Sequence, residues 1–373
     1  MSEMLKSLKK ALSEIIKNSS QVFIVGHNEP DFDSISSAIG LRTICQLFGR
    51  KSYIIVNDNE ANLEPGVRKI INENHEKFNI IDLATFEKLV DYNSSLIITD
   101  TNKSYLLPVK DYLECFKYKM IIDHHAKDQH TVEADYTYIT QDASSASEMV
   151  AQVLNSYHLR YDEDVANYLL AGIQLDTNRY SNNTSSKTHN VAEKLIERGA
   201  NPSVVSKLFR AEFETDRRIN NLIYNGSLFE TYERSIFQTR QVSFTLNRDA
   251  PTTIYKKEDL AKAADKMLDY NVDASFVMGY ISDNLVSVSA RSKSDIDIGK
   301  IMESLGGGGN QASAACKIVT PSIDLVEERL RELVFASICE NKNDITSIAV
   351  EQPDFSAVIS KEPYVKVKIQ PKE

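Results

Sequence analysis

Apolar residues near the start of the chain recur at helical spacing. Leu5, Leu8, Leu12 and Ile15 fall on one face of a helix that would span Met4–Asn18, and lysines fall on the opposite face. This pattern is typical of an amphipathic helix with one face on a core and the other in water. We therefore predict that the helix packs beside the first strand of a sheet.

Short apolar runs alternate with helical patterns through the first half of the chain. The helical patterns cover Ser34–Phe48, Ser144–Tyr157, Thr188–Arg198 and Pro202–Phe209. The apolar runs, interpreted as buried strands, are Val22–Val25, Leu96–Thr99, Met120–Ile122 and Leu169–Leu175. Alternation of strands and helices is typical of a mostly parallel sheet with crossover helices. We predict an α/β domain over residues 1–205, with helices flanking the sheet.

The second half of the chain is expected to form a smaller α+β domain over residues 226–340. Its strand-like and helical runs are Ser235–Leu246, Ala274–Ile281, Leu285–Ala290, Lys257–Asp269 and Gly299–Leu305. Residues 206–225 are assigned to a linker, because Glu212–Asn225 is polar and helix-prone. Residues 341–373 are assigned to a C-terminal tail, in which the alternation of Tyr364–Ile369 suggests an edge strand or a partly ordered arm.

Composition narrows the classes of protein. A chain of 373 residues with 42% hydrophobic content can build real cores, and it has no run approaching the roughly 18 apolar residues of a membrane span. The four cysteines lack paired spacing, so we expect reduced, buried thiols and a cytoplasmic location. A net charge of −10 argues against a long nucleic acid as partner, but it leaves small phosphorylated ligands open.

Acidic and imidazole side chains follow the four apolar runs of the first domain. They are His27, Asp31 and Asp33 after the first run, Asp100 after the second, His124 after the third and Asp176 after the fourth. Loops at the carboxyl ends of parallel strands converge on one crevice, so these residues can meet. Carboxylates packed so closely do not all stay ionised without cations between them. The pattern therefore predicts a site for two metal ions.

Each of these residues also has an ordinary structural explanation. An aspartate before a helix, such as Asp33, is commonly an N-cap, and a lone aspartate after a strand, such as Asp100, is often a turn former. Neither explanation accounts for the fixed spacing of His27 and Asp31. Adjacent side chains diverge, so we assign His124 to a metal and His125 to the substrate or to supporting contacts. The carboxylates favour manganese or magnesium over zinc, and two such ions can generate a bridging hydroxide for phosphorus chemistry.

The ordered motifs resemble those of a known family. Gly26-His27 with Pro30-Asp31 and Asp33, Asp100-Thr101-Asn102, Asp123-His124-His125 and Asp176 are similar to the metal motifs of the DHH phosphoesterases, and they span about half the chain. Ser289-Ala290-Arg291-Ser292 and the run Leu305–Asn310 resemble the DHH-associated C-terminal substrate domain. Gly26-His27, Asp100–Lys103 and Thr184–Thr188 are most similar to the catalytic half of bacterial cyclic di-AMP phosphodiesterases.

The resemblance implies roles for individual residues. His27, Asp31 and Asp100 would hold one Mn²⁺, and Asp33, Asp100, His124 and Asp176 the other. Asp100 and His125 would be catalytic, and the substrate would be bound by Arg291, Gly307, Gly308, Gly309 and Asn310. Asn310 departs from the family, which usually has histidine there, so we expect a weaker grip on phosphate. The alternative explanation for Arg291 is a surface salt bridge, and the alternative explanation for the glycines is that they end a helix.

We expect a metal-dependent phosphodiesterase that opens a cyclic dinucleotide to a linear one. The alternatives are a nuclease of short oligoribonucleotides that also removes phosphate from 3'-phosphoadenosine 5'-phosphate, and a nucleotide sensor without catalysis. The glycine run argues against the inorganic pyrophosphatases that share the first-domain motifs. The sequence leaves open the base of the substrate, a homodimer, and whether this chain stands alone or is a fragment of a membrane-anchored protein.

Overall fold

The computed structural model describes residues 3–57, 63–158, 160–210, 213–224, 230–235, 238–246 and 254–339. The chain divides into two compact units, Met1–Ala211 and Glu212–Glu373. Each unit has its own six-stranded sheet. The predicted strand or arm at Tyr364–Ile369 lies outside the described residues.

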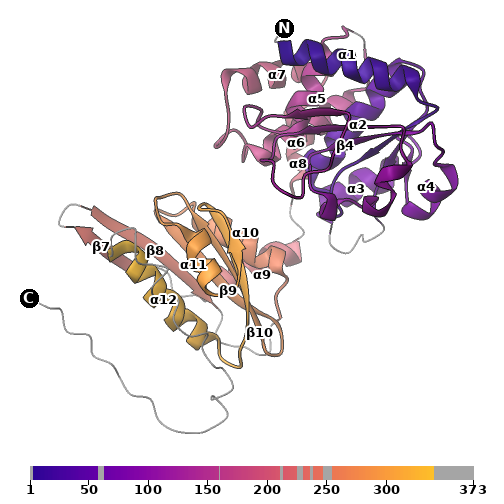
Figure 1. Cartoon of the computed structure of the whole chain (residues 1–373). Helices are drawn as coiled ribbons and strands as arrows, with labels where there is room; N and C mark the ends of the chain where they lie inside the picture. Colours follow the sequence, from indigo (N-terminus) through magenta and orange to yellow (C-terminus); the bar gives the residue numbers. More distant parts are fainter. Residues whose placement is uncertain are drawn as a thin grey trace, which may run out of the picture. The chain divides into compact units, whose positions relative to one another are not determined.

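The first unit is built on a parallel sheet whose strand order is β3-β2-β1-β4-β5-β6 (Figure 1). Its strands are β1 Val22–Val25, β2 Ser52–Ile55, β3 Ile80–Ile81, β4 Ser95–Thr99, β5 Tyr118–Asp123 and β6 Tyr136–Ile139. Its helices are α1 Glu3–Asn18, α2 Phe32–Leu47, α3 Pro65–Asn74, α4 Leu83–Leu89, α5 Ala146–Asn155, α6 Glu163–Asp176, α7 Ser186–Glu197 and α8 Pro202–Leu208. Two 3₁₀ helices, η2 Ser104–Leu106 and η3 Lys110–Cys115, lie between β4 and β5.

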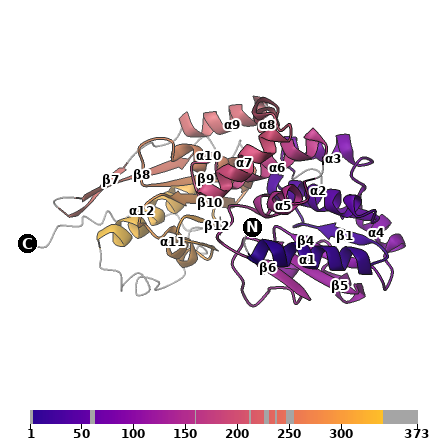
Figure 2. The ribbon, with the colours of Figure 1, turned by 90° about the horizontal axis from the view of Figure 1, so that it is seen from above.

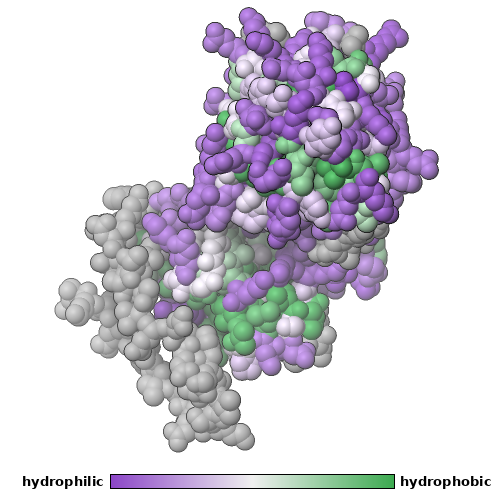
Figure 3. Space-filling view, turned by 45° about the vertical axis from the view of Figure 1, so that its right-hand side comes forward, coloured by the Kyte–Doolittle hydropathy of each residue, from purple (hydrophilic) through white to green (hydrophobic). Residues whose placement is uncertain are grey.

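Helices cover both faces of this sheet because alternate strand residues point to opposite sides. Val22 and Ile24 join a core with α1, α2, α3, α5, α6, α7 and α8, while Phe23 and Val25 join a second core with α4 and η3. Figure 2 shows α2, α5, α6 and α7 gathered beside β1 and β4. Hydrophilic residues dominate the face of this unit that is visible in Figure 3. These layers confirm the predicted α/β class.

One predicted strand of the first domain is wrong. Leu169–Leu175 belongs to helix α6, so Asp176 ends a helix and does not follow a strand. The helix packs between α2, α5, α7 and α8, and it is therefore apolar on most of its surface. A buried helix and a buried strand both give an unbroken apolar run, so periodicity alone could not separate them.

In its described residues, the second unit is a mixed sheet with two helices on each face. Its strand order is β11-β12-β10-β9-β8-β7, parallel at β8–β9 and antiparallel elsewhere. The strands are β7 Glu230–Ser235, β8 Gln238–Leu246, β9 Ala274–Ser282, β10 Leu285–Ser292, β11 Gly308–Gly309 and β12 Ser313–Val319. The helices are α9 Phe213–Tyr224, α10 Lys257–Met267, α11 Ile298–Ser304 and α12 Ile323–Cys339. This arrangement confirms the predicted α+β character of the second half.

The assigned linker contains a helix of the second unit. Ile219, Leu222 and Ile223 of α9 are buried against α10 in one small core. Their spacing is helical, but the many polar residues around them concealed it. The first unit correspondingly runs to Ala211 and not to residue 205.

Candidate metal centre and the pocket of the second unit

Three neighbouring strands bring the first residues of the metal centre together. β1, β4 and β5 are adjacent and parallel, so the loops after Val25, Thr99 and Asp123 leave the same edge of the sheet. His27, Asp100 and His124 stand on these loops. The sequence-based expectation that residues about 100 positions apart would converge holds for this edge.

Asp100 occupies the middle of the centre. Its Oδ1 lies 3.5 Å from Nε2 of His124, and its Oδ2 lies 3.5 Å from Nε2 of His27. The backbone of Asp100 is left-handed, with φ of 58°, and its N–H donates to the carbonyl of Ile122 over 3.1 Å. A left-handed backbone costs free energy in a residue other than glycine, and such residues often cluster at functional sites. Each carboxylate oxygen thus faces a different imidazole, as in a ligand shared by two ions.

The six residues expected from the sequence fall into two groups around Asp100. Within each group, one potential ligand atom of every member lies within 4.8 Å of the others. The groups are His27, Asp31 and Asp100, and Asp33, Asp100, His124 and Asp176. The structure therefore places all six side chains at one centre.

The two aspartates at the start of α2 are held by different parts of the fold. Asp31, and not Asp33, is the N-cap of α2, and its Oδ1 accepts from the N–H groups of Asp33 and Ser34. Asp33 is fully buried, and its two oxygens accept from the N–H groups of Ala146 and Ser147, each over 2.7 Å. Asp33 thus satisfies the start of α5, which the sequence could not reveal because the partner lies more than 110 residues away.

A glycine allows α6 to bring Asp176 to the centre. Gly172 lies one turn before Asp176, and a Cβ at this position would be 2.2 Å from Ser147 Oγ and 3.0 Å from Asp33 Oδ1. Any side chain at residue 172 would push α6 away from the start of α5. Nothing in the local pattern singled out this glycine.

The donor set fits divalent cations. Nε2 of His124 and Oδ2 of Asp176 are buried and have no hydrogen bond of acceptable geometry among the described residues, although they lie 3.2 Å apart. Buried polar atoms without a partner are costly, so such a pair calls for another partner. Four carboxylates and two imidazoles are ligands that suit a hard or borderline divalent ion.

The electrostatics show how strongly these groups are coupled. Burial raises the pKa of Asp100 well above its usual value, and the charges of Asp33 and Asp31 raise it further. Burial and Asp33 likewise raise the pKa of Asp176 to about 7. Burial alone would lower the pKa of His124, but the carboxylates of Asp100 and Asp176 beside its Nε2 raise it to about 11. Without cations the cluster therefore tends to hold protons.

Asp123 and Asn102 support the centre, and the sequence analysis gave them no role. Asp123 is fully buried, and its Oδ1 lies 2.9 Å from Nδ1 of His125. Asn102 donates to Asp123 Oδ2 over 2.6 Å and to the carbonyl of His125 over 3.2 Å. The side chain of His125 is 55% exposed, so its other nitrogen is open to a ligand. The signal was present, since Asp123 directly precedes the two histidines.

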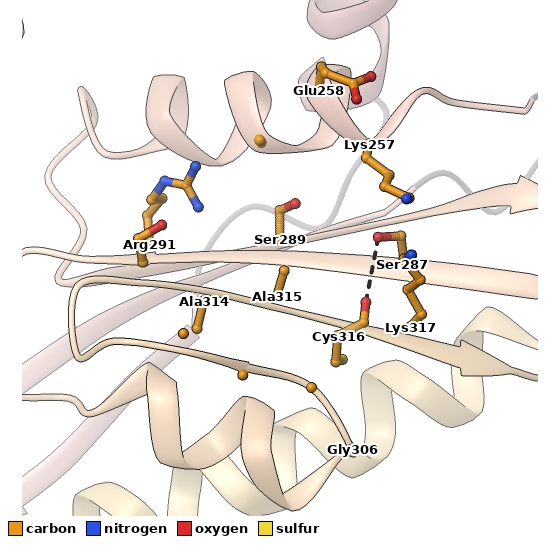
Figure 4. A pocket seen from close by; sticks show the side chains of 15 residues that line it. Lys257, Glu258, Ser287, Ser289, Arg291, Gly306, Ala314, Ala315, Cys316 and Lys317 are labelled. Carbon is orange, nitrogen blue, oxygen red and sulfur yellow. Dashed lines mark hydrogen bonds between the residues drawn. The ribbon is translucent and has the colours of Figure 1, made fainter. Parts of the chain in front are cut away.

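The second unit contains a pocket of about 650 Å³ (Figure 4). Its lining includes Arg291 and the predicted glycines Gly307, Gly308 and Gly309, but not Asn310. The guanidinium of Arg291 is engaged by Asp265, with Nε 2.7 Å from Oδ1. Oδ1 of Asn310 accepts from the N–H groups of Ala312 and Ser313, so this side chain shapes the turn before β12.

Two of the glycines have a structural cause. A Cβ on Gly307 would be 2.2 Å from the carbonyl oxygen of Ala315, and one on Gly309, where φ is 146°, would be 2.4 Å from Cα of Ala314. At residues 307 and 309 the backbone therefore lies too close to β12 for a side chain. A Cβ on Gly308 would meet nothing within 4 Å.

The described part of the chain has no helix that is both long and apolar enough to cross a membrane.

Residues 21–173 match the N-terminal domain of the DHH family, and residues 246–337 match the DHHA1 domain. The chain belongs to the DHH family. This confirms the resemblance predicted from the motifs.

Two relatives illustrate what this DHH protein is similar to. The cyclic-di-AMP phosphodiesterase PdeA of Listeria monocytogenes is 29% identical over 341 residues, which cover 87% of this chain and 48% of PdeA. A membrane protein–ribosomal subunit bL9 fusion protein of Aster yellows witches'-broom phytoplasma is 30% identical over 334 residues, or 87% of this chain and 38% of the fusion. The DHH chain thus spans less than half the length of these two relatives.

A solved structure shares the fold. The exopolyphosphatase-related protein of Bacteroides fragilis aligns with a TM-score of 0.67 over 89% of this chain and 98% of its own, at 16% identity. Identity at this level supports the architecture and says nothing of the substrate.

Proposed function

We propose that this DHH protein is a phosphodiesterase that hydrolyses a cyclic dinucleotide, cyclic di-AMP, to a linear dinucleotide. The observation that carries the proposal is the shared position of Asp100, whose two oxygens face different imidazoles. A ligand shared by two ions is typical of sites that cleave phosphoryl esters. The choice of substrate is supported by relatives that are named cyclic-di-AMP phosphodiesterases and are 28–29% identical in sequence to this chain.

We assign the metal ligands as two overlapping sets. His27, Asp31 and Asp100 hold one Mn²⁺, or Mg²⁺ in its place, and Asp33, Asp100, His124 and Asp176 hold the second. Ions at these positions would supply an activated water and neutralise charge on the phosphoryl group. The N–H groups of Ala146 and Ser147 fix the direction of Asp33, so this ligand is aligned before any ion binds.

His125 is assigned to the leaving oxygen. Its Nδ1 contacts Asp123, and the side chain, which also carries Nε2, is 55% exposed. An imidazole oriented in this way can donate a proton to the departing ribose oxygen. Asp123 acts through His125 and is therefore a positioning residue.

The second unit is assigned to substrate binding. Arg291, Gly307, Gly308 and Gly309 line its pocket. Asn310 was predicted to contact substrate with them, and we now assign it to the turn that carries the glycines. The cytoplasmic location remains a prediction of the sequence, which leaves a homodimer open.

The first experiment is a comparison of substrates. The full chain with Mn²⁺ is offered cyclic di-AMP, cyclic di-GMP, their linear dinucleotides, 3'-phosphoadenosine 5'-phosphate and pyrophosphate, and initial rates are measured by chromatography. We expect the highest kcat/KM on cyclic di-AMP. Hydrolysis of the linear compounds or pyrophosphate without any turnover of a cyclic dinucleotide would refute the proposal.

The role of Asp100 is tested by Asp100→Asn. Both ions would lose their shared ligand, which is worth several kcal/mol, so kcat/KM should fall by about a thousandfold or more. Asp162→Asn is the matched control, because this carboxylate is 65% exposed and its one ion pair among the described residues is with Lys77. An Asp100→Asn variant that still binds two ions per chain would contradict the shared position.

A further inference from the structure

Positive charge in the pocket of the second unit comes from residues outside the family motifs. The charged residues of its lining are Lys257, Glu258, Arg291 and Lys317. Arg291 is occupied by Asp265. Figure 4 shows the carboxyl group of Glu258 directed away from the two lysines. Within the described part of the chain, neither lysine has an ion-pair partner.

The two lysines converge although they come from different elements. Lys257 is the first residue of α10, and Lys317 lies on β12 directly opposite Ser287 of β10. Figure 4 shows the Lys257 side chain reaching from α10 toward Ser287 and Lys317. Lys257 lies close enough to lower the pKa of Lys317, because two ammonium groups repel each other. Such a pair gains from an anion placed between its members.

The surface of the pocket beneath the two lysines is polar because side chains alternate along strand β10. Val286 and Val288 point into the core with α11 and α12, and the alternate residues Ser287 and Ser289 point into the pocket. The hydroxyl of Ser287 lies 3.5 Å from the carbonyl oxygen of Cys316, at the outer limit of a hydrogen bond. This hydroxyl can therefore turn to a ligand. Lys256 makes no side-chain cap, so the first N–H groups of α10 also add positive potential nearby.

We propose that Lys257, Lys317 and Ser287 bind the terminal phosphate monoester of a linear nucleotide. This inference rests on the proposed function, since it takes the ligand to be a nucleotide. A terminal monoester carries about 1.5 to 2 negative charges at pH 7, whereas each diester of a cyclic dinucleotide carries one. Two unpaired ammonium groups therefore favour a linear nucleotide with a phosphate end over the cyclic form. The linear product of the reaction belongs to this class.

The test measures binding by calorimetry on the full chain in EDTA, so that no ligand is hydrolysed. The probes are linear di-adenosine dinucleotide with a 5'-phosphate, the same dinucleotide without it, and cyclic di-AMP. We expect the unsubstituted chain to bind the phosphorylated probe most tightly. Lys257→Gln and Lys317→Gln should each weaken the binding of that probe about tenfold, equivalent to about 1.4 kcal/mol. The same substitutions should weaken the binding of the unphosphorylated probe by less than about twofold.

The matched control is Lys300→Gln. Lys300 lies on α11 of the same unit, is 58% exposed, pairs with Asp297 and does not line the pocket. Lys300→Gln makes the same change in net charge as the two pocket substitutions. Because it lies outside the pocket, it should leave the affinities for all three probes unchanged. Both pocket lysines are exposed, so their substitution should not disturb folding, which thermal unfolding of each variant checks.

Several results would overturn the site. One is that the unsubstituted chain binds both linear probes with equal affinity. Another is that the lysine variants lose affinity for both linear probes to the same extent. A third is that Lys300→Gln weakens the phosphorylated probe's binding as much as the pocket substitutions do. Failure of the proposed function gives a different result. In that case Mn²⁺-dependent hydrolysis of cyclic di-AMP is absent, while the lysine-dependent difference between the linear probes persists.

Discussion

The two units hold their charged groups in opposite ways. In the first unit, Asp33 and Asp100 are at most 3% exposed, and protein N–H groups or a strained backbone fix them. In the second unit, Lys257 and Lys317 are exposed side chains without a described ion-pair partner. Burial makes charge interactions strong, and exposure lets water and salt weaken them.

This difference indicates two kinds of recognition. A rigid, buried cluster of like charges selects a compact, highly charged partner such as a divalent cation. Exposed lysines on flexible stems adapt to an anion, and they lose less when it leaves. The comparison predicts that the first unit depends on cations for its stability and that the second unit does not.

The largest expected effect is stabilisation of the first unit by Mn²⁺. Each ion that binds only the folded cluster, at 100 times its Kd, would add about 2.7 kcal/mol. This corresponds to a rise in Tm of roughly 5–10 °C for a unit of this size. Hydrogen exchange resolves the units, and amides of β1, β4 and β5 should gain protection while those of β9 and β10 should not. Equal protection of both sheets would break the comparison.

Gly172→Ala should have the next largest effect. Its Cβ would enter the space of Ser147 Oγ and Asp33 Oδ1, at 2.2 and 3.0 Å. We expect a loss of about 1–3 kcal/mol in the free energy of unfolding, together with weaker Mn²⁺ binding. Denaturant unfolding and metal titration measure the two effects. Gly308→Ala serves as the control for stability, because its Cβ would meet nothing within 4 Å; comparable losses from both substitutions would show that crowding at residue 172 is not the cause.

The smallest effect is expected from Asp265→Asn in the second unit. Asp265 is 58% exposed, so loss of its pair with Arg291 should change the free energy of unfolding by less than about 1 kcal/mol. The freed guanidinium should tighten binding of the 5'-phosphorylated linear dinucleotide by less than about tenfold, as calorimetry would show. Weaker binding in this variant would mean that Asp265 positions Arg291 and does not restrain it.

Sequence patterns predicted most elements because their local signals agree with the fold. The runs of β1, β4 and β5 are buried on both faces, and the residues after them are charged, so their strand ends were readable. The helix α6 was missed because burial made it uniformly apolar, and α9 was assigned to a linker because its three buried residues lie among polar ones. Both errors arose because the burial of a segment depends on its tertiary neighbours, which the sequence of the segment does not specify.

The sequence by itself determined which side chains could meet at the first unit's centre, because the order of parallel strands sends successive loops to one edge. It also determined the family, through the motifs around His27, Asp100, His124 and Asp176. Only the tertiary structure decided how these groups are held. In the first unit, the start of α5 fixes Asp33, and Gly172 makes room for Asp33. In the second unit, Arg291 pairs with Asp265, while Lys257 and Lys317, which lie outside the motifs, have no described ion-pair partner. Such contacts join residues distant in sequence, and they depend on how helices and strands pack in space.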